Sequence, residues 1–452
     1  MKIALITYYL RMNDYPTKYS LAALRLGEYL NSSGIDVELV PVALVDLDFA
    51  EFVKEKIEGK YDIVGISNYV WSRKATPQIA KIIRENAPKT SIIIGGPEVK
   101  YTDLSLYKNE LFILGEGEQS LLNAIRYIEQ GRSDQSFFEK NPNIFDKEHP
   151  ERKLIPERLL YKSPLFTKFR NIDRDFLYYE TTRGCGYNCG YCGFKNRENV
   201  EFFDLEFVEE EIKRIGELGF KDVFIIDANL GGTPQRAKEI LKMFAVYASQ
   251  ARLTIYLRPE FIDDEMICLL KATNIKEIRI GIQTTNKKIP EWIRSNSIEK
   301  VTKELPKLSK ANIHWKAEFI VGLPGDDMKG LTESLEFAET VLRPTEICCY
   351  PLTVIKDTPM FKMVDSESKE WIKIDENSRA YESFSYTHDE LIEMQEYAKR
   401  KMNNYLRQHS NWDRLTVQHK IENNKGIDKQ VDRIIQGIKK DLDVLEELKK
   451  WD

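Results

Sequence analysis

Three cysteines, Cys185, Cys189 and Cys192, lie close together in the sequence with the spacing Cys-x3-Cys-x2-Cys. Glycines flank all three of them. An iron–sulfur cluster is held by cysteine thiolates, and a glycine-rich backbone can bend around it. Three thiolates on a cube of four irons leave one iron without a protein ligand. The triplet therefore predicts a 4Fe–4S cluster whose open iron could bind and reduce a small molecule.

Other readings of the triplet explain less of it. A structural zinc site needs four ligands, usually in two separated pairs, and the remaining cysteines and the five histidines offer no such pair. A disulfide framework is not expected in a long chain without a secretory leader. A redox dithiol formed by Cys189 and Cys192 leaves Cys185 unexplained. The remaining cysteines are Cys268, Cys348 and Cys349.

The triplet, with the aromatic Tyr191 just before its last cysteine, resembles the motif of the radical S-adenosylmethionine enzymes. In that family the methionine end of S-adenosylmethionine chelates the fourth iron. An electron from the cluster then cleaves the sulfonium and generates a 5′-deoxyadenosyl radical. The resemblance implies a 4Fe–4S cluster with Cys185, Cys189 and Cys192 as its catalytic ligands. It also implies S-adenosylmethionine and an electron donor such as flavodoxin or ferredoxin.

Length and composition describe a chain of several globular domains. With 452 residues, two or three domains are expected. The hydrophobic content of 42% and the charged content of 31% are typical of a soluble globular protein. A net charge of −5 gives no general attraction to nucleic acid, and no apolar run has the length of a membrane span. The run Ile3–Leu10 fits a buried strand better than a signal core, so we expect a cytoplasmic, oxygen-sensitive protein.

The first 130 residues alternate short apolar runs with helical patterns. This alternation predicts a doubly wound parallel sheet of the Rossmann-like type, covered by helices. The predicted strands are Ile3–Tyr9, Val37–Val40, Ile63–Ser67, Ser91–Ile94 and Leu111–Leu114. The predicted helices are Leu21–Ser32, Pro77–Asn86 and Gln119–Gln130.

Three loops that follow these strands could bind a flat, bulky ligand. Ligands of such sheets bind beyond the carboxyl ends of the strands, and glycines let the backbone approach them closely. On spacing alone these loops are as typical of any α/β sheet as of a binding site. The residues concerned are Ser67, Tyr69 and Trp71 in the first loop, Gly95, Gly96, Pro97 and Glu98 in the second, and Gly115, Glu116 and Gly117 in the third.

In front of a radical S-adenosylmethionine core, this domain resembles the cobalamin-binding domain of one large subgroup of the family. The segments Ile63–Trp71, Ile94–Val99 and Gly115–Glu118 resemble that subgroup's loops around the corrin. The Asp-x-His-x-x-Gly motif of other cobalamin proteins is absent, and the first 130 residues contain no histidine. The resemblance thus implies base-off cobalamin without a histidine ligand. Tyr69 or Trp71 is expected beneath the corrin, although Trp71 could instead pack at a helix entry.

Residues 131–174 break the periodicity and are predicted to be a connector rich in proline and charge. Residues 175–360 again alternate strand and helix patterns, which predicts a partial (β/α)6 barrel of the radical S-adenosylmethionine type. Its predicted strands are Phe176–Glu180, Asp222–Ile226, Arg252–Leu257, Lys276–Ile282, Ile313–Phe319 and Glu346–Tyr350. Its predicted helices are Glu206–Leu218, Pro234–Ala248, Asp263–Lys271, Ser297–Lys310 and Lys329–Leu342.

The ends of the barrel strands are expected to hold S-adenosylmethionine. The resemblance implies that Asp227 and Asn229 bind the methionine ammonium, and that Arg258 binds its carboxylate or ribose. It further places Gln283 and Thr284 at the ribose. The adenine side is implied for Val321 and Leu323, and Tyr191 and Phe194 are expected beside the cluster and the adenine.

Each of these residues also has a structural alternative. Asp227 and Asn229 could cap the following loop, Arg258 could form an interdomain ion pair, and Gln283 could satisfy buried backbone. The family often has a Gly-Gly-Glu run after the second strand. Here the run Ile226–Asn229 stands in its place, which leaves the ammonium contacts less well specified.

The remaining residues, 361–452, are predicted to be mainly helical. Thr387 and Glu390 form a capping box that opens a helix through about Arg407. Apolar residues at helical spacing near 429–449 predict a second helix. These helices are expected to cover the open side of the barrel.

The chain thus resembles cobalamin-dependent radical S-adenosylmethionine enzymes over roughly residues 1–360, and many of these are methyltransferases. The implied mechanism has one S-adenosylmethionine methylate cobalamin and a second generate the radical that abstracts a substrate hydrogen. The substrate radical then takes the methyl group. Alternatives are a cobalamin-dependent rearrangement or cyclisation, and a cobalamin-free lyase or sulfur-transfer enzyme. A peptide or protein side chain is the favoured substrate class, a small molecule remains open, and neither a membrane nor nucleic acid is expected as a partner.

Overall fold

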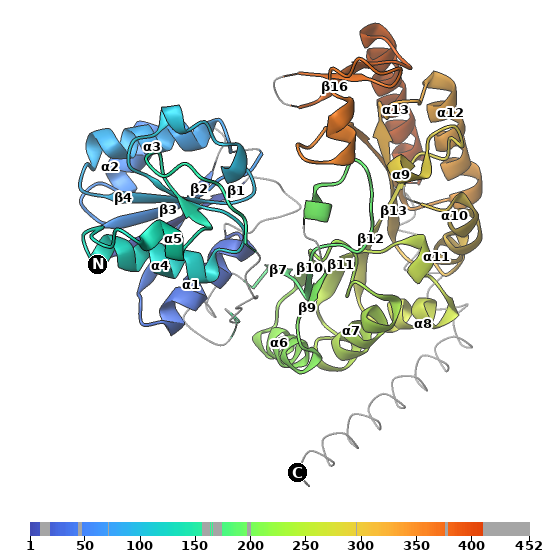
Figure 1. Ribbon diagram of the computed structural model, residues 1–452. Helices are drawn as coiled ribbons and strands as arrows, with labels where there is room; N and C mark the ends of the chain where they lie inside the picture. The colour runs from blue at the N-terminus through green and yellow to red at the C-terminus, as the bar shows by residue number, and fades with distance from the viewer. Residues whose placement is uncertain are drawn as a thin grey trace. The chain divides into compact units, whose positions relative to one another are not determined.

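The computed structural model describes residues 1–9, 19–43, 48–70, 72–155, 163, 165, 174–196, 200–294, 296–375 and 378–409. Trp71, most of the predicted connector after residue 155 and the predicted helix near 429–449 lie outside the described residues. The chain forms two compact units, Met1–Phe176 and Leu177–Asp452 (Figure 1).

The first unit contains a six-stranded sheet in the order β2-β1-β3-β4-β5-β6. The first five strands in this order run parallel, and β6 is antiparallel to β5. All five predicted strands are therefore confirmed, whereas the two-residue β6 lies in the segment that was predicted as connector. The bounds are β1 Ile3–Tyr9, β2 Val37–Ala43, β3 Ile63–Ser67, β4 Ser91–Gly95, β5 Leu111–Ile113 and β6 Ile144–Phe145.

Helices cover both faces of this sheet (Figure 1). Helices α2 and α3 bury one core against it, and α1, α4 and α5 bury another on the opposite face. In β1, Ile6 belongs to the first core and Leu5 to the second. Burial on both faces explains why the strands read as continuous apolar runs. The bounds are α1 Leu21–Ser32, α2 Phe49–Lys56, α3 Ala75–Asn86, α4 Glu118–Glu129 and α5 Phe137–Lys140; α2 and α5 were not predicted.

The second unit contains a six-stranded sheet in the order β14-β13-β12-β11-β10-β7. The pairs from β10 to β14 are parallel, and the N–H of Ile226 donates to the carbonyl of Tyr179 at the β7 edge. The six strands follow the order of the sequence, as a partial barrel requires. The bounds are β7 Phe176–Tyr179, β10 Asp222–Ile225, β11 Arg252–Tyr256, β12 Ile275–Gln283, β13 Trp315–Val321 and β14 Glu346–Pro351.

Helices cover the outer face of the second sheet (Figure 1). In β13 the residues on this face, such as Trp315 and Phe319, are fully buried, whereas those between them are partly exposed. The predicted helix over 297–310 is divided before Pro306, because proline lacks the N–H that would continue the helix. The helix bounds are α6 Leu205–Leu218, α7 Pro234–Tyr247, α8 Asp264–Ala272, α9 Glu291–Arg294, α10 Ile298–Glu304, α11 Pro306–Lys310 and α12 Met328–Phe337.

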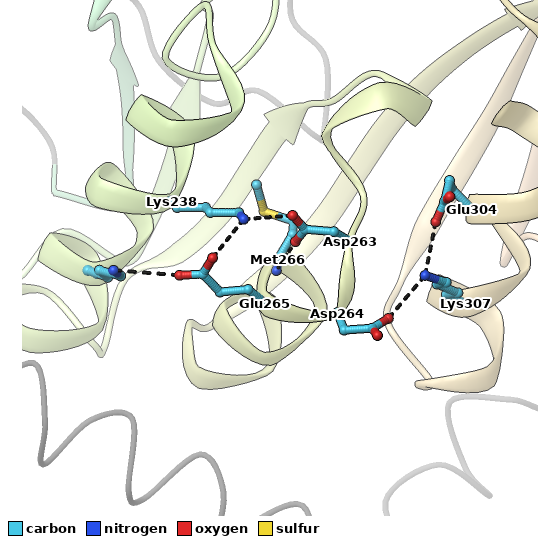
Figure 2. Close-up of polar contacts among 8 residues, drawn as sticks. Lys238, Asp263, Asp264, Glu265, Met266, Glu304 and Lys307 are labelled. Carbon is cyan, nitrogen blue, oxygen red and sulfur yellow. Dashed lines mark hydrogen bonds and ion pairs between the residues drawn. The ribbon is translucent and has the colours of Figure 1, made fainter.

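Ion pairs connect the outer helices (Figure 2). Lys238 of α7 lies 2.7 Å from Asp263 and 2.7 Å from Glu265, at the beginning of α8. Lys307 of α11 lies 3.0 Å from Asp264, the first residue of α8. The side chain of Lys238 is only 9% exposed, so its pairs are screened less than those of a surface lysine. These contacts help to hold α7, α8 and α11 in order around the sheet.

The last described segment contains two short strands and one long helix. Strands β15, Ile372–Ile374, and β16, Ala380–Ser383, form an antiparallel pair that was not predicted. Helix α13, His388–His409, begins at the predicted capping box, because the Glu390 carboxylate accepts from the Thr387 N–H at 2.8 Å. It packs against β14 and α12. Among the described helices, none is long and apolar enough to span a membrane.

The close approach of α6 and α7 generates a stability prediction. A side chain at Gly216 in α6 would overlap the backbone carbonyl of Tyr247, at the end of α7. Ala normally stabilises a helix relative to Gly. Here we expect Gly216→Ala to lower the unfolding free energy of the second unit by about 1–3 kcal/mol, because the two helices must move apart. Urea unfolding followed by circular dichroism measures this change.

The matched control is Glu210→Ala, on the exposed side of α6. This substitution should change the unfolding free energy by less than about 0.5 kcal/mol. A Gly216→Ala variant as stable as the parent protein would show that the two helices are not packed this closely.

Candidate cofactor sites

The cysteine loop follows β7 and the two-residue strand β8, Thr182–Arg183, at the carboxyl end of the second sheet. All three cysteines are present as thiols, not disulfides; Cys189 is buried, and Cys185 and Cys192 are partly buried. Burial raises the pKa of Cys185, and it raises the pKa of Cys192 to about 11. The nearby Cys189 thiol adds to both effects by charge repulsion. Three thiols that would repel one another as thiolates favour a cationic centre between them.

Two backbone contacts fix the middle of the cysteine loop. The N–H of Gly190 donates to the carbonyl of Trp292 in α9 at 2.7 Å, and the N–H of Met360 donates to the carbonyl of Gly190 at 2.9 Å. A side chain at position 190 would overlap the indole ring of Trp292. Glycine is therefore required here by the close approach of α9. The loop between Cys189 and Cys192 is held by segments far away in the sequence.

Tyr191 and Phe194 differ in how far their side chains are buried. Tyr191 packs against the apolar cluster that contains Ile289 and Leu323, whereas the Phe194 side chain is 55% exposed. In the described part of the chain, no three His, Cys, Asp or Glu side chains converge closely enough to bind a single metal ion. The thiolates of an iron–sulfur cube bind different irons, so such a site requires thiols spaced around a cluster.

Asp227 organises the entry to the cysteine loop. Its buried carboxylate accepts from the N–H of Thr181 at 2.6 Å, the hydroxyl of Thr181 at 2.5 Å, the N–H of Thr182 at 3.1 Å and the N–H of Gly231 at 2.9 Å. Burial raises the pKa of Asp227, and these four hydrogen bonds oppose the rise. The contacts match the loop-capping alternative that the sequence left open. They occupy the carboxylate that was predicted to bind the methionine ammonium.

Asn229, two residues further on, is in the opposite situation. Its side chain is buried, and neither its Oδ1 nor its Nδ2 has a hydrogen-bond partner among the residues that the structure describes. Thr182 donates its N–H to Asp227, but its buried hydroxyl has no hydrogen-bond partner among the described residues. Unpaired buried polar groups are rare, because each one costs free energy unless a ligand or water satisfies it. Asn229 is therefore suited to bind a polar group of a cofactor.

Arg258, which follows β11, lies over the ring of Tyr187 in the cysteine loop, with 3.7 Å between the guanidinium carbon and the ring centroid. It also forms an ion pair with Glu260 at 3.1 Å. Its positive charge lowers the pKa of Cys185, against the larger effect of burial. Of the predicted cofactor residues that follow the barrel strands, Arg258 is thus the one whose charge acts directly on the cysteines. Its observed ion pair is formed within the second unit.

Gln283 ends β12 in an unusual backbone conformation. Its φ angle is 68°, and its side chain lies over Gly281, at a register shift between β12 and β13. A left-handed conformation is strained for a residue other than glycine, and such strain often occurs at functional positions. The geometry places the Gln283 amide at the carboxyl end of the sheet. No hydrogen bond of Gln283 to buried backbone supports the structural alternative within the described residues.

A buried polar network supports the loops after β12 and β13. Asp326 accepts from Thr284 at 3.2 Å and from Asn286 at 2.8 Å, and Ser334 of α12 lies 3.2 Å from the Thr284 hydroxyl. A side chain at Gly330 would overlap both the Asp326 carboxylate and the Asn286 amide. Sequence reasoning missed this network, although the polar run after β12 was a visible signal. The network joins the two loops, after β12 and β13, that were predicted to bind S-adenosylmethionine.

Val321 and Leu323 are core residues in the turn after β13. Their exposed fractions are 3% and 0%. Between them, Gly322 has a φ angle of 92°, and its carbonyl accepts from the Tyr386 hydroxyl at 2.6 Å. A contact of this turn with adenine would therefore have to come mainly from its backbone. The side chains of Val321 and Leu323 instead hold the turn against the core.

The inner face of the second sheet carries charged side chains that sequence reasoning did not identify. Glu277 is paired with Arg279 at 2.6 Å and with Lys316 at 3.0 Å. Glu318 lies 4.0 Å from Arg279, and burial raises its pKa. The signal was the alternation of charged with apolar residues in two strands that are buried on one face only. This face could bind a polar substrate.

In the first unit, the loops after β3 and β4 are bound to each other through Asn68. Its N–H donates to the carbonyl of Gly95 at 2.7 Å, and its carbonyl accepts from the N–H of Glu98 at 3.1 Å. Gly96 has a φ angle of 107°, and a Cβ there would lie 2.6 Å from the carbonyl oxygen of Asn68. The two predicted corrin loops thus form one surface. Pro97, which stands between Gly96 and Glu98 in the second loop, is exposed.

Ser72 shapes the first of these loops from within. Its buried hydroxyl accepts from the N–H of Tyr69 at 2.9 Å and lies 3.3 Å from the carbonyl of Ser67. The side chains of Ser67 and Tyr69 are both partly exposed, whereas Trp71 falls outside the described residues. Neither Ser72 nor Asn68 was predicted as a site residue. Their closeness in the sequence to the predicted residues Ser67 and Tyr69 was the available signal.

The third loop follows β5 and leads into α4. Gly115 is exposed and has a φ angle of 73°, which favours glycine. Glu116 and Gly117 are partly exposed, and Gly117 stands directly before α4. The structure thus brings all described residues of the three predicted corrin loops to the carboxyl edge of one sheet, where ligands of such sheets bind.

The segments that contain most of each sheet match the models of two known families. Residues 15–125 match the model of the B12 binding domain, and residues 179–338 match that of the radical SAM superfamily. These domains imply cobalamin, a 4Fe–4S cluster and S-adenosylmethionine as cofactors, as the sequence predicted. Radical S-adenosylmethionine enzymes also typically need an electron donor.

Several characterised proteins are similar to this chain. The 2-(S-pantetheinyl)-carbapenam-3-carboxylate methyltransferase of Streptantibioticus cattleyicolor is 24% identical over 66% of this chain and 48% of its own length. The cobalamin-dependent radical SAM methyltransferase TokK of Streptomyces tokunonensis is 23% identical over 78% of this chain and 56% of its own length. The chain thus spans about half the length of these curated relatives.

Solved structures share the fold. The radical S-adenosylmethionine methyltransferase TsrM of Kitasatospora setae, with cobalamin and a 4Fe–4S cluster bound, has a TM-score of 0.64 at 18% identity and covers 79% of this chain and 76% of its own. The cobalamin-dependent S-adenosylmethionine radical enzyme OxsB has a TM-score of 0.67 at 16% identity and covers 97% of this chain and 71% of its own. These similarities confirm the α/β architecture of both units.

Asp227 and Asn229 provide a matched pair of variants. Asp227→Asn puts an amide N–H against donors that now share a carboxylate, so we expect the second unit to lose about 2–4 kcal/mol of unfolding free energy. Asn229→Ala removes a side chain without hydrogen bonds, so stability should change by less than about 1 kcal/mol while S-adenosylmethionine binding weakens.

Urea unfolding and equilibrium dialysis with labelled S-adenosylmethionine measure the two effects. If Asn229→Ala destabilised the protein as much as Asp227→Asn and left S-adenosylmethionine binding unchanged, these two roles would be wrong.

Proposed function

We propose that this chain, which joins a B12 binding domain to a radical SAM domain, is a cobalamin-dependent radical S-adenosylmethionine methyltransferase. The main support is that one chain combines two features. Residues 15–125 match the B12 binding domain, and the cysteine triplet lies at a strand end within residues 179–338, which match the radical SAM superfamily. The first part fits a carrier of methyl groups. The second fits a generator of radicals.

In this proposal the side chains of the second unit hold and orient the two cofactors there. Cys185, Cys189 and Cys192 bind the cluster, while the unpaired amide of Asn229 binds the amino-acid end of S-adenosylmethionine. Arg258, already beside the cysteine loop, supplies positive charge for the carboxylate or the ribose. When bound, the cluster supplies the electron that cleaves S-adenosylmethionine, and cobalamin supplies a methyl group for a carbon that nucleophilic methylation cannot reach.

In the first unit, the surface built by the loops around Asn68 and Gly115 binds the corrin. Cobalamin is proposed to be base-off and without a histidine ligand, with Tyr69 or Trp71 beneath the ring. The absence of histidine from residues 1–130 supports this coordination. The glycines at the sheet edge let the backbone approach a wide, flat ring.

The substrate is proposed to be polar and to bind at the inner face of the second sheet. The ion pairs of Glu277, Arg279 and Lys316, with Glu318 beside them, support this assignment, because they can exchange partners with charged groups of a substrate. A peptide or protein side chain is the first class to test, followed by small metabolites. The electron donor is proposed to be a flavodoxin or a ferredoxin in the cytoplasm, where free cysteines remain reduced.

The activity is tested with anaerobically reconstituted protein that contains iron, sulfide and cobalamin. Candidate peptides and metabolite extracts are incubated with a reductant and with S-adenosylmethionine deuterated in its methyl group. We expect both 5′-deoxyadenosine and S-adenosylhomocysteine, together with a product that carries the labelled methyl group. A product without added methyl would instead indicate rearrangement or cyclisation, and a protein that binds no corrinoid would exclude the proposal.

The cysteine assignment generates a separate prediction. Cys189→Ala removes a buried ligand of the proposed cluster, so iron content and 5′-deoxyadenosine formation should fall below detection while cobalamin binding persists. Cys268→Ala, outside the triplet, is the matched control and should change neither quantity. Reductive cleavage of S-adenosylmethionine by the Cys189→Ala protein would refute the cluster assignment.

A further inference from the structure

We propose that Leu154 and Ile155 form one wall of the cobalamin site in the first unit. This inference rests on the proposed function, because it assigns a further part of the same corrinoid site. The two residues lie outside the segment 15–125 that matches the B12 binding domain. They belong to the stretch that the sequence predicts as a connector, so neither the family match nor the sequence pattern gives them a role.

The backbone at Ile155 is fixed beside the carboxyl end of β5. Leu114, the residue after β5, donates its N–H to the carbonyl of Asn143 at 2.8 Å. The Asn143 side chain in turn binds Ile155 twice: its Oδ1 accepts from the Ile155 N–H at 2.7 Å, and its Nδ2 donates to the Ile155 carbonyl at 2.9 Å. Asn143 is buried. A buried amide thus holds this stretch at the edge where β5 leads into Gly115.

A second anchor lies three residues earlier. The guanidinium of Arg152 donates to the carbonyl of Lys100 at 2.5 Å and to the carbonyl of Thr102 at 2.6 Å. It also lies over the ring of Phe145 in β6, with 5.3 Å to the ring centroid. Lys100 belongs to the short helical turn Val99–Tyr101, which directly follows the second corrin loop. The stretch is therefore attached to the structure next to both the second and the third loops.

Between these anchors, Leu154 rests on the third corrin loop. A Cβ at Gly115 would lie 2.7 Å from Cδ1 of Leu154, so the leucine side chain lies against the glycine backbone. Even so, Leu154 is 55% exposed and Ile155 is 39% exposed. Two large aliphatic side chains are thus anchored and left partly in water beside the loops that bind the ligand. Because they lie directly beside the proposed ligand surface, these two side chains are suited to contact an apolar part of the ligand.

A corrinoid is the occupant that fits this surface. Leu154 contacts Gly115 itself, one of the residues at the edge of the B12 binding domain, so the apolar surface is continuous with the proposed ligand surface. The rim of a corrin ring carries methyl groups, which gain free energy when they contact leucine and isoleucine instead of water. The wall would contact this rim, while the glycine loops contact the face of the ring.

The first experiment titrates the full-length protein with hydroxocobalamin and follows the corrin absorption spectrum. Leu154→Ala and Ile155→Ala should each raise the Kd about tenfold, equivalent to about 1.4 kcal/mol. Leu106→Ala is the matched control, because Leu106 is also exposed, at 52%, and its carbonyl contacts Arg84 in the last turn of α3, away from the loops. It should leave the Kd within twofold of the parent value. Unchanged Kd values in the first two variants would overturn the proposal.

The second experiment needs no variant. Hydroxyl-radical footprinting of the parent protein, read by mass spectrometry, should show Leu154 and Ile155 protected when hydroxocobalamin is bound, with Leu106 equally reactive in both states. Equal labelling of Leu154 with and without cobalamin would also overturn the proposal. If the variants changed the oligomeric state but not the Kd, the surface would be a protein interface instead.

The outcomes separate this inference from the proposed function. A parent protein that binds no corrinoid removes both. If the parent protein binds cobalamin but Leu154→Ala and Ile155→Ala leave the Kd unchanged, or if cobalamin does not protect Leu154, only the assignment of the wall is removed.

Discussion

The buried carboxylate of Asp227 is the group on which the geometry around the cysteine loop depends. It binds the backbone of Thr181 and Thr182, just before the cysteine loop, and the backbone of Gly231, in the loop after β10. Two strand ends are thus fixed by one buried group. Because a buried carboxylate must have its hydrogen bonds satisfied, any movement of either loop would be costly. Asn229 lies between these fixed points, which keeps its unpaired amide in place for a ligand.

The two sheets differ in which of their surfaces are left uncovered by helices. Both faces of the first sheet are covered by helices, so its carboxyl edge is the place left for a ligand, and glycines there keep the backbone accessible. The second sheet is covered on its outer face, and its inner face carries partly exposed charged residues such as Arg279 and Glu318. The first arrangement suits a wide, flat cofactor. The second suits a site that must also admit a substrate.

Much of the fold could be predicted from the sequence, because apolar periodicity depends on local pattern alone. Apart from the two-residue β6, the strands of both sheets follow it closely, as do helices such as α1 and α6. Helix α2 and the pair β15 and β16 were missed, since they are too short for a periodic pattern to be recognised. Pro306 was visible in the sequence, but one continuous helix was predicted across it, whereas the structure has two. The chemistry of the cysteine triplet was likewise evident, because ligand type and spacing are local properties.

What the sequence by itself determined is the kind of elements present, together with the prediction that Cys185, Cys189 and Cys192 bind a cluster. Only the tertiary structure decided which polar residues remain available to a ligand. Asp227 and Asn229 are equally plausible ligands in the sequence, yet the folded chain uses one for internal hydrogen bonds and leaves the other unpaired. The position of Leu154 against Gly115 was equally invisible. The physical reason is that hydrogen-bond partners and packing contacts come from segments distant in the chain, and local patterns carry no record of them.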